Sequence, residues 1–213
     1  DIRLQLGYIF FFITSTANLF INGGRTGQVT FIIMIFISVI MNLEHKTKGI
    51  FVSLLLLGSI FITAYTFSPN FHSRTNQGIN DIQKIIYEND YTGSVGQRVS
   101  LWIIGADNFK DNFLFGKGIG NDVDDIKYYA KKNGFDPEFF SRFDDNHNMF
   151  LIIALQQGII GLLIVGVMFY AIFRLKFKSK THRILNLTFI TAFFLWSFGN
   201  TTLHTMNAMT FFA

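Results

Sequence analysis

Long apolar stretches separated by polar segments dominate the pattern of hydrophobic positions in this 213-residue chain. Five stretches are roughly 20 residues long, which is what one α-helix needs to cross the hydrocarbon core of a bilayer. They cover residues 4–21, 26–43, 49–67, 149–173 and 184–202. The pattern therefore predicts five membrane-spanning helices, and a last apolar run over residues 205–213 predicts the start of a sixth.

The order of these stretches predicts three parts. Residues 1–67 hold three transmembrane helices, residues 68–148 form a long connection, and residues 149–213 hold two more helices and the start of a further one. The chain begins at Asp1 rather than at a methionine, and its first apolar run lacks a signal-peptide cleavage pattern. We therefore expect an internal start and a larger membrane protein around this chain.

The long connection between the third and fourth stretches carries signals of ordered helices, although its length alone would also fit disorder. Asn80 and Gln83 have the spacing of a capping box, and isoleucines around them recur at helical spacing. Helices are expected from residue 80 onward, over residues 96–112 and over residues 122–132. The Asn133-Gly134 pair would end the last one. We expect a lid of short helices over the outer mouth of a helical bundle.

The composition excludes an ordinary soluble domain. Half of the residues are hydrophobic and only 15% are charged, against about 25% in soluble domains. The chain has no cysteine, which excludes a disulfide scaffold, a thiolate metal site and a cysteine nucleophile.

The positions of the charges orient the predicted bundle. Short loops rich in Lys and Arg lie on the cytoplasmic side of a membrane, and residues 44–48 and 174–183 are such loops. Residues 22–25 and 68–148 then lie on the external face, and the latter segment carries 12 acidic and 9 basic residues. The net charge of +4 is therefore an orientation signal, and a nucleic-acid partner is not expected.

Three residues from separate parts of the chain are predicted to lie at this external boundary: Arg25, Arg98 and His147. Each has an ordinary explanation, because Arg25 could anchor a span, Arg98 could belong to a solvated helix face, and His147 could cap a helix. Together they suit a different chemistry. Two guanidinium groups can hold a diphosphate by charge-assisted hydrogen bonds, and a neutral imidazole can accept a proton from a hydroxyl.

Weaker signals lie nearby. Residues 116–120 are glycine-rich but lack the Gly-Lys-Ser/Thr of a P-loop, so they predict a turn or at most a backbone nest for an oxyanion. Asp122 and Asp124 match the short acidic pattern of nucleotide-sugar transferases, but nucleotide sugars are absent outside the cytoplasm. The external aspartates favour a solvated surface over a site for a divalent cation; they are Asp122, Asp124, Asp125, Asp144 and Asp145. Gly158 and Gly161 favour close helix packing.

Several short motifs follow one another in a fixed order along the chain. They are Arg25-Thr-Gly, Arg98-x-x-x-Trp102, Phe115-Gly-x-Gly-x-Gly120, His147-Asn148-x-x-Leu151, and Gln156 or Gln157 followed by Gly158 and Gly161. In this order the chain resembles, over nearly its whole length, the O-antigen ligase and polymerase family of bacterial membrane glycosyltransferases. One difference is that Asn146 stands where the family usually has proline before the His-Asn pair.

The resemblance implies the C-terminal half of an all-α, polytopic helical bundle of the lipid-sugar glycosyltransferase (GT-C-like) type in the bacterial inner membrane. It implies transfer of a glycan from undecaprenyl diphosphate to an acceptor hydroxyl at the periplasmic face, with inversion and without metal or cofactor. Arg25 and Arg98 would contact the diphosphate and His147 would activate the hydroxyl. Asn148, Trp102 and Gly118 would support them.

The acceptor expected from the resemblance is lipid A core, which makes the protein an O-antigen ligase. An O-antigen polymerase and a protein O-oligosaccharyltransferase are the alternatives within the same chemistry. A transporter half is the alternative from another class. Transporters place ionisable residues at the bilayer midplane, and none of the five predicted spans contains Asp, Glu, Lys or Arg.

Overall fold

The computed structural model describes residues 2–22, 24–120, 125–143 and 146–200. Within these ranges the chain forms nine helices and no strand. The protein is an all-α polytopic membrane protein, as the hydropathy pattern predicts. It divides into two compact units between Asn80 and Asp81, and each unit is described by itself.

The first unit contains three apolar helices and the beginning of a fourth, more polar one. They are α1 (Ile2–Ile21), α2 (Arg25–Asn42), α3 (Lys46–Phe67) and the first part of α4 (Pro69–Glu88). Helices α2 and α3 pack closely at Gly49, where an added Cβ would lie 3.2 Å from the Cα of Ile40. The side chain of Gln28 ties α2 to α1 by donating to the carbonyl of Leu19.

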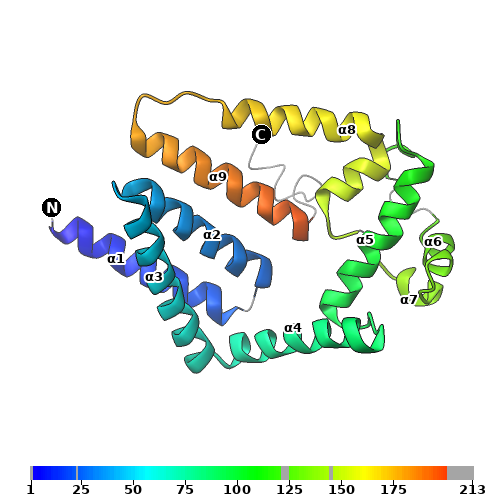
Figure 1. Cartoon of the computed structure of the whole chain (residues 1–213), viewed down its shortest axis with the longest axis horizontal. Helices are drawn as coiled ribbons and strands as arrows, with labels where there is room; N and C mark the ends of the chain where they lie inside the picture. Colours follow the sequence, from blue (N-terminus) through cyan, green and yellow to red (C-terminus); the bar gives the residue numbers. More distant parts are fainter. Residues whose placement is uncertain (1, 23, 121–124, 144–145, 201–213) are drawn as a thin grey trace. The chain divides into compact units, whose positions relative to one another are not determined.

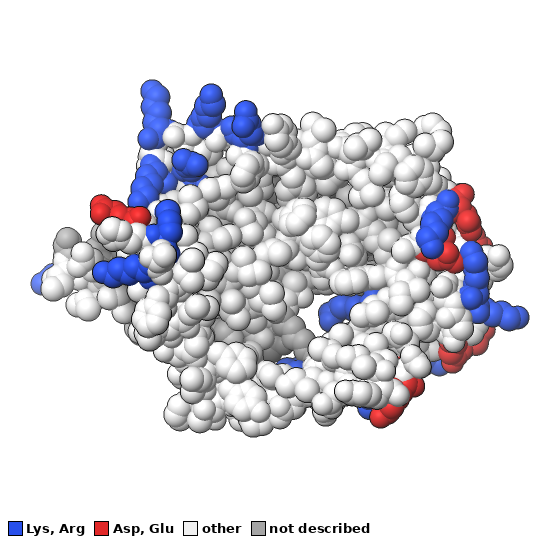
Figure 2. Space-filling view, in the orientation of Figure 1, with Lys and Arg blue, Asp and Glu red and all other residues white. Residues whose placement is uncertain are grey.

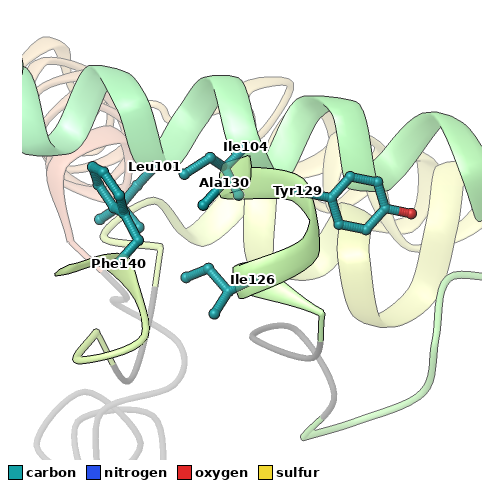
Figure 3. Packing of buried hydrophobic residues seen from close by; sticks show 6 residues of the cluster. All are labelled: Leu101, Ile104, Ile126, Tyr129, Ala130 and Phe140. Atoms are coloured by element: carbon teal, nitrogen blue, oxygen red, sulfur yellow. The ribbon is translucent and has the colours of Figure 1, made fainter. Parts of the chain in front are cut away.

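The second unit is built around α5 (Ser94–Asp111), which contacts both short and long helices (Figure 1). The short helices α6 (Ile126–Lys132) and α7 (Pro137–Phe140) pack on α5 through six buried residues (Figure 3). These are Leu101, Ile104, Ile126, Tyr129, Ala130 and Phe140. The long helix α8 (Met149–Phe173) also contacts α5, and α9 (Lys180–Gly199) packs against α8. Helix α5 is thus held on two sides.

Where the structure describes them, each of the five predicted apolar stretches forms a helix. Three of the described helices, α1, α3 and α8, are long and apolar enough to cross a membrane. The apolar part of α2 is shorter, Thr26–Asn42, and the crossings by α2 and α9 remain predictions from the sequence. Figure 2 shows Lys and Arg side chains gathered over the α8–α9 connection, while α8 itself carries no charged side chain. This distribution fits a short basic loop at a membrane surface.

One sequence prediction of a helix boundary is wrong. The helix expected from residue 80 begins at Pro69, because Ser68 accepts the N–H of Phe71 at 3.2 Å and Pro69 occupies the first helical position. The bounds predicted for the stretch over residues 149–173 are those of α8, and within this helix Gly158 has non-helical dihedral angles (φ 67°, ψ −160°) and bends it. The segments 122–124, 144–145 and 201–213 lie outside the described residues, and with them the predicted sixth span.

The helix predicted over residues 96–112 is confirmed as α5. The end of the helix predicted over residues 122–132 is also confirmed, because α6 ends at Lys132. Asn133 is its C-cap and Gly134 follows with φ +78°. Gly134 therefore occupies the left-handed region that suits a glycine after a helix.

Candidate functional site

Helix α5 places Arg98 and Trp102 one turn apart, with Gly105 on the next turn of the same face. At Gly105, α5 packs against the side chain of Leu151 in the first turn of α8. A Cβ at this position would lie 2.6 Å from Cδ2 of Leu151. The face of α5 that carries Arg98 and Trp102 is therefore also the face on which α8 begins.

The first turn of α8 is fixed by Asn148. This buried side chain is the N-cap, and its Oδ1 accepts the N–H groups of Phe150 at 3.0 Å and Leu151 at 3.2 Å. The sequence left open whether His147 caps this helix, and the structure gives that role to Asn148.

His147 precedes the cap in a left-handed backbone conformation, with φ +48°. This region is sparsely populated by residues other than glycine, and its occupation marks a backbone held by its surroundings. The half-buried imidazole lies edge-on to the ring of Phe143, with 6.2 Å between ring centroids. The side chain is thus presented from a constrained loop directly before a capped helix.

Helix α5 and the first segment of α8 run in the same direction. The pair is in contact at Gly105 and Leu151, and eight residues later the N–H of Ile159 donates to the carbonyl of Phe113 at 2.8 Å. Arg98 comes before Gly105 in α5, and His147 comes before Leu151, just ahead of the start of α8. Both therefore lie toward the same end of the pair.

The glycine-rich turn after α5 fits into the bend of α8. The N–H groups of Lys117 and Gly118 donate to the carbonyls of Leu155 and Gln156, at 2.7 and 2.9 Å. These carbonyls are freed by the non-helical geometry of Gly158. The predicted turn is confirmed. The alternative, a backbone nest for an oxyanion, is wrong for these two N–H groups, because both already donate hydrogen bonds to carbonyls of α8.

Two buried donors on α5 have no acceptor among the described residues. They are Nε of Arg98 and Nε1 of Trp102. Both groups can only donate, and a buried donor without an acceptor costs about 1–3 kcal/mol. Since both lie on one face, they favour binding of a group rich in acceptor oxygens at that face, and the guanidinium favours an anion.

A network of charged side chains holds α6 against the C-terminal half of α5. The hydroxyl of Tyr129 donates to Asp111 at 2.7 Å, and Lys132 pairs with Asp107 at 2.8 Å. The hydrogen bond from Lys132 holds the pKa of Asp107 below its usual value, and burial followed by the bond to Asp111 raises the pKa of Tyr129. Lys117 of the glycine-rich turn pairs with Asp125 at 2.8 Å. The network therefore also restrains the turn that enters the α8 bend.

The structure brings some of the predicted site residues together in one unit. Arg98, Trp102, Gly118, His147 and Asn148 all belong to the second unit. Arg25 is the first residue of α2 in the first unit, and its side chain lies outside what the structure describes. Its place at the site remains a prediction.

The external aspartates are only partly covered by the structure. Asp122, Asp124, Asp144 and Asp145 lie outside the described residues. Elsewhere in the described ranges, no three His, Asp or Glu side chains converge as a metal site would require. Asp125, the remaining member of the acidic group, pairs with Lys117.

Sequence reasoning missed Gly105 and Asn146. Gly105 lies seven residues after Arg98, and that spacing alone could have placed it on the same helix face. Asn146 is 1% exposed directly before His147, where the motif comparison pointed only to a missing proline. Nothing in the spacing signals its burial, which results from the packing around the start of α8.

Comparison with known proteins gives two findings. The sequence model of a family described as "O-Antigen ligase" matches residues 10–166. A protein of Haemophilus influenzae whose function is uncharacterised is 23% identical over 167 residues, which are 77% of this chain and 42% of the relative. The chain thus spans about two-fifths of the length of that relative.

Proposed function

The chain belongs to the O-antigen ligase family, and from this membership we propose that it is the part of a membrane glycosyltransferase that holds the diphosphate and activates the acceptor. The donor is a glycan linked to undecaprenyl diphosphate, and the acceptor is a hydroxyl of lipid A core. The reaction takes place at the periplasmic face of the bacterial inner membrane.

The observation that carries the proposal is the pair of buried donors on α5. Nε of Arg98 and Nε1 of Trp102 lack acceptors among the described residues. A diphosphate offers several charged oxygens, which a guanidinium binds with short, strong hydrogen bonds. Arg25 supplies the second positive charge. Neutralising the diphosphate makes it a better leaving group.

His147 is the general base of the proposed reaction. Its imidazole takes the proton of the acceptor hydroxyl while the hydroxyl oxygen attacks the anomeric carbon. The bond between that carbon and the diphosphate oxygen breaks, and undecaprenyl diphosphate leaves with both electrons of the bond. Attack from the face opposite the leaving group inverts the anomeric configuration. Support for the base comes from the constrained loop that holds His147 before Asn148.

The acceptor distinguishes the proposed ligase activity from two other activities that use the same chemistry. A growing O-chain as acceptor would make the protein a polymerase, and a protein hydroxyl would make it an O-oligosaccharyltransferase. A deletion strain distinguishes them, because unligated O-chains, single-repeat lipopolysaccharide and unglycosylated protein are three different products.

The activity test uses the full-length protein in vesicles with lipid-linked glycan and candidate acceptors, read by mass spectrometry of the product. Arg98→Ala and His147→Ala are expected to insert normally and to abolish transfer. Arg183→Ala and His182→Ala are matched controls, because both side chains are exposed and lie in the first turn of α9, within the segment 174–183 that is predicted to be cytoplasmic. Normal transfer by His147→Ala would overturn the base assignment, and normal transfer by Arg98→Ala would overturn the diphosphate site.

A further inference from the structure

Helix α4 carries a row of exposed isoleucines along one face. Ile79, Ile82 and Ile86 recur at helical spacing and are 51%, 49% and 65% exposed. The opposite face carries polar side chains, among them Gln77 and Lys84. Such a helix is amphipathic, and its apolar face would be costly to leave in water.

The first turn of α4 is fixed at the ends of two apolar helices. Ser68 donates its hydroxyl to the carbonyl of Phe20 at 3.1 Å, and Asn70 donates its amide to the carbonyl of Ile21 at 3.0 Å. These carbonyls end α1, while α3 ends at Phe67. Both α1 and α3 have the length and composition of membrane spans. The start of α4 therefore lies at the boundary between membrane and water.

Helix α4 does not continue the axis of α3 but turns sharply away from it (Figure 1). The corner is held by Tyr65 of α3, whose ring stacks on His72 with 4.2 Å between centroids. The hydroxyl of Tyr65 also donates to Asn76 at 3.1 Å. A helix that starts at the boundary and leaves the span axis runs along the membrane surface.

The direction of the isoleucine row follows from Phe71, which lies on the same apolar stripe. Phe71 is buried and packs edge-on against Phe20 of α1 and Phe61 of α3, with centroids 5.1 and 5.5 Å away. The stripe thus begins against the membrane-spanning helices. Its continuation through the isoleucines faces the same way, toward the plane of the membrane.

From this geometry we infer that α4 is an interfacial helix, whose isoleucine row is buried in the headgroup and upper acyl region of the outer leaflet. The charged residues of α4 are two basic and two acidic, Arg74, Lys84, Asp81 and Glu88. Binding therefore depends on apolar burial and not on anionic lipid. This inference is independent of the proposed reaction.

The test measures the depth of spin labels on the full-length protein in phosphatidylcholine vesicles. The chain itself has no cysteine, so Ile82→Cys, Ile86→Cys and the polar-face control Gln77→Cys can be labelled singly once any cysteine elsewhere in the protein is replaced. Accessibility is read by power saturation with oxygen, which concentrates in lipid, and with a water-soluble nickel chelate.

The ratio of oxygen to nickel accessibility is expected to be several-fold higher at positions 82 and 86 than at position 77. Equal nickel accessibility at all three positions would overturn the inference, because the isoleucine row would then face water. Exclusion of both reagents from positions 82 and 86 would also overturn it, because protein rather than lipid would cover the row. Water exposure of the label at position 77 shows in the same experiment that the helix has its folded orientation.

Discussion

Gly116 and Gly158 lie on opposite sides of one close contact between two backbone segments. A Cβ on Gly116 would lie 2.5 Å from the carbonyl carbon of Gln156, and a Cβ on Gly158 would lie 2.2 Å from the carbonyl oxygen of Leu114. Both glycines have a positive φ, +69° and +67°. The contact joins the turn after α5 to the bend in α8, so it fixes the position of α8 relative to the helix that carries Arg98.

The first prediction concerns this contact. Gly116→Ala and Gly158→Ala should each prevent the turn from entering the bend, because the new methyl group meets backbone that cannot rotate away. We expect a loss above about 3 kcal/mol, combining overpacking and the cost of a positive φ. Thermal unfolding of the purified protein in detergent measures it.

Gly134→Ala is the matched control for that prediction. Gly134 also has a positive φ, +78°, but a Cβ there would meet nothing within 4 Å. Only the conformational cost of about 1–2 kcal/mol is expected. If all three variants lost the same stability, the steric part of the argument would be refuted.

The same contact shows what could be predicted from the sequence. Hydropathy located the apolar helices, since membrane crossing sets their length, and Asn133-Gly134 located the end of α6. The bend at Gly158 could not be predicted, because it depends on a partner turn more than 40 residues earlier in the chain. Sequence distance hides such a contact, although both glycines were visible in the motifs.

The candidate site was predictable in part for a similar reason. The motif order pointed to Arg98 and His147, and the structure puts both toward one end of the α5–α8 pair. The cap at Asn148 is a local contact, which the sequence did not distinguish from a cap by His147, whereas the close approach at Gly105 depends on packing between the two helices. Periodicity places residues on a face but does not say what that face meets.

A second prediction separates binding from folding at Trp102. Its buried Nε1 has no acceptor among the described residues, so Trp102→Phe removes a donor that lowers the stability of the folded protein. The unfolding midpoint should stay unchanged or rise, while KM for the lipid-linked donor should increase about 5- to 30-fold, as expected for one lost hydrogen bond of 1–2 kcal/mol. A lower midpoint with unchanged KM would show that the indole N–H serves folding only.

A third prediction tests the guanidinium of Arg98. Arg98→Lys keeps the positive charge but loses Nε and the planar arrangement of donors. Transfer should fall at least about tenfold through KM, with membrane insertion intact. If Arg98→Lys kept full transfer activity, charge alone would be sufficient and the buried Nε would play no part in donor binding.

The close approach of α5 to α8 leads to a fourth prediction. Gly105→Ala places a methyl group 2.6 Å from Cδ2 of Leu151 and should cost about 1–3 kcal/mol. The atom it meets belongs to a side chain, so Leu151→Ala should relieve the clash in the double variant. A double-mutant cycle is expected to give a coupling of about 0.5–3 kcal/mol in favour of the pair. Additive losses would mean that the two residues do not meet.

The last prediction uses the ion pair between Lys132 of α6 and Asp107 of α5. The hydrogen bond from Lys132 lowers the pKa of Asp107 in the folded protein, so its contribution is present above the unfolded pKa of 3.8 and is lost as pH falls through the folded value. At neutral pH, Lys132→Ala should lower the thermal midpoint more than Lys131→Ala, because Lys131 is an exposed neighbour for which no ion pair is found within the described chain. Well below pH 3.8, once Asp107 is protonated, the two variants should unfold at nearly the same temperature. A difference of undiminished size in acid would show that Lys132 stabilises α6 through its packing on Tyr129, whose ring lies 5.4 Å from its Nζ, and not through its charge on Asp107.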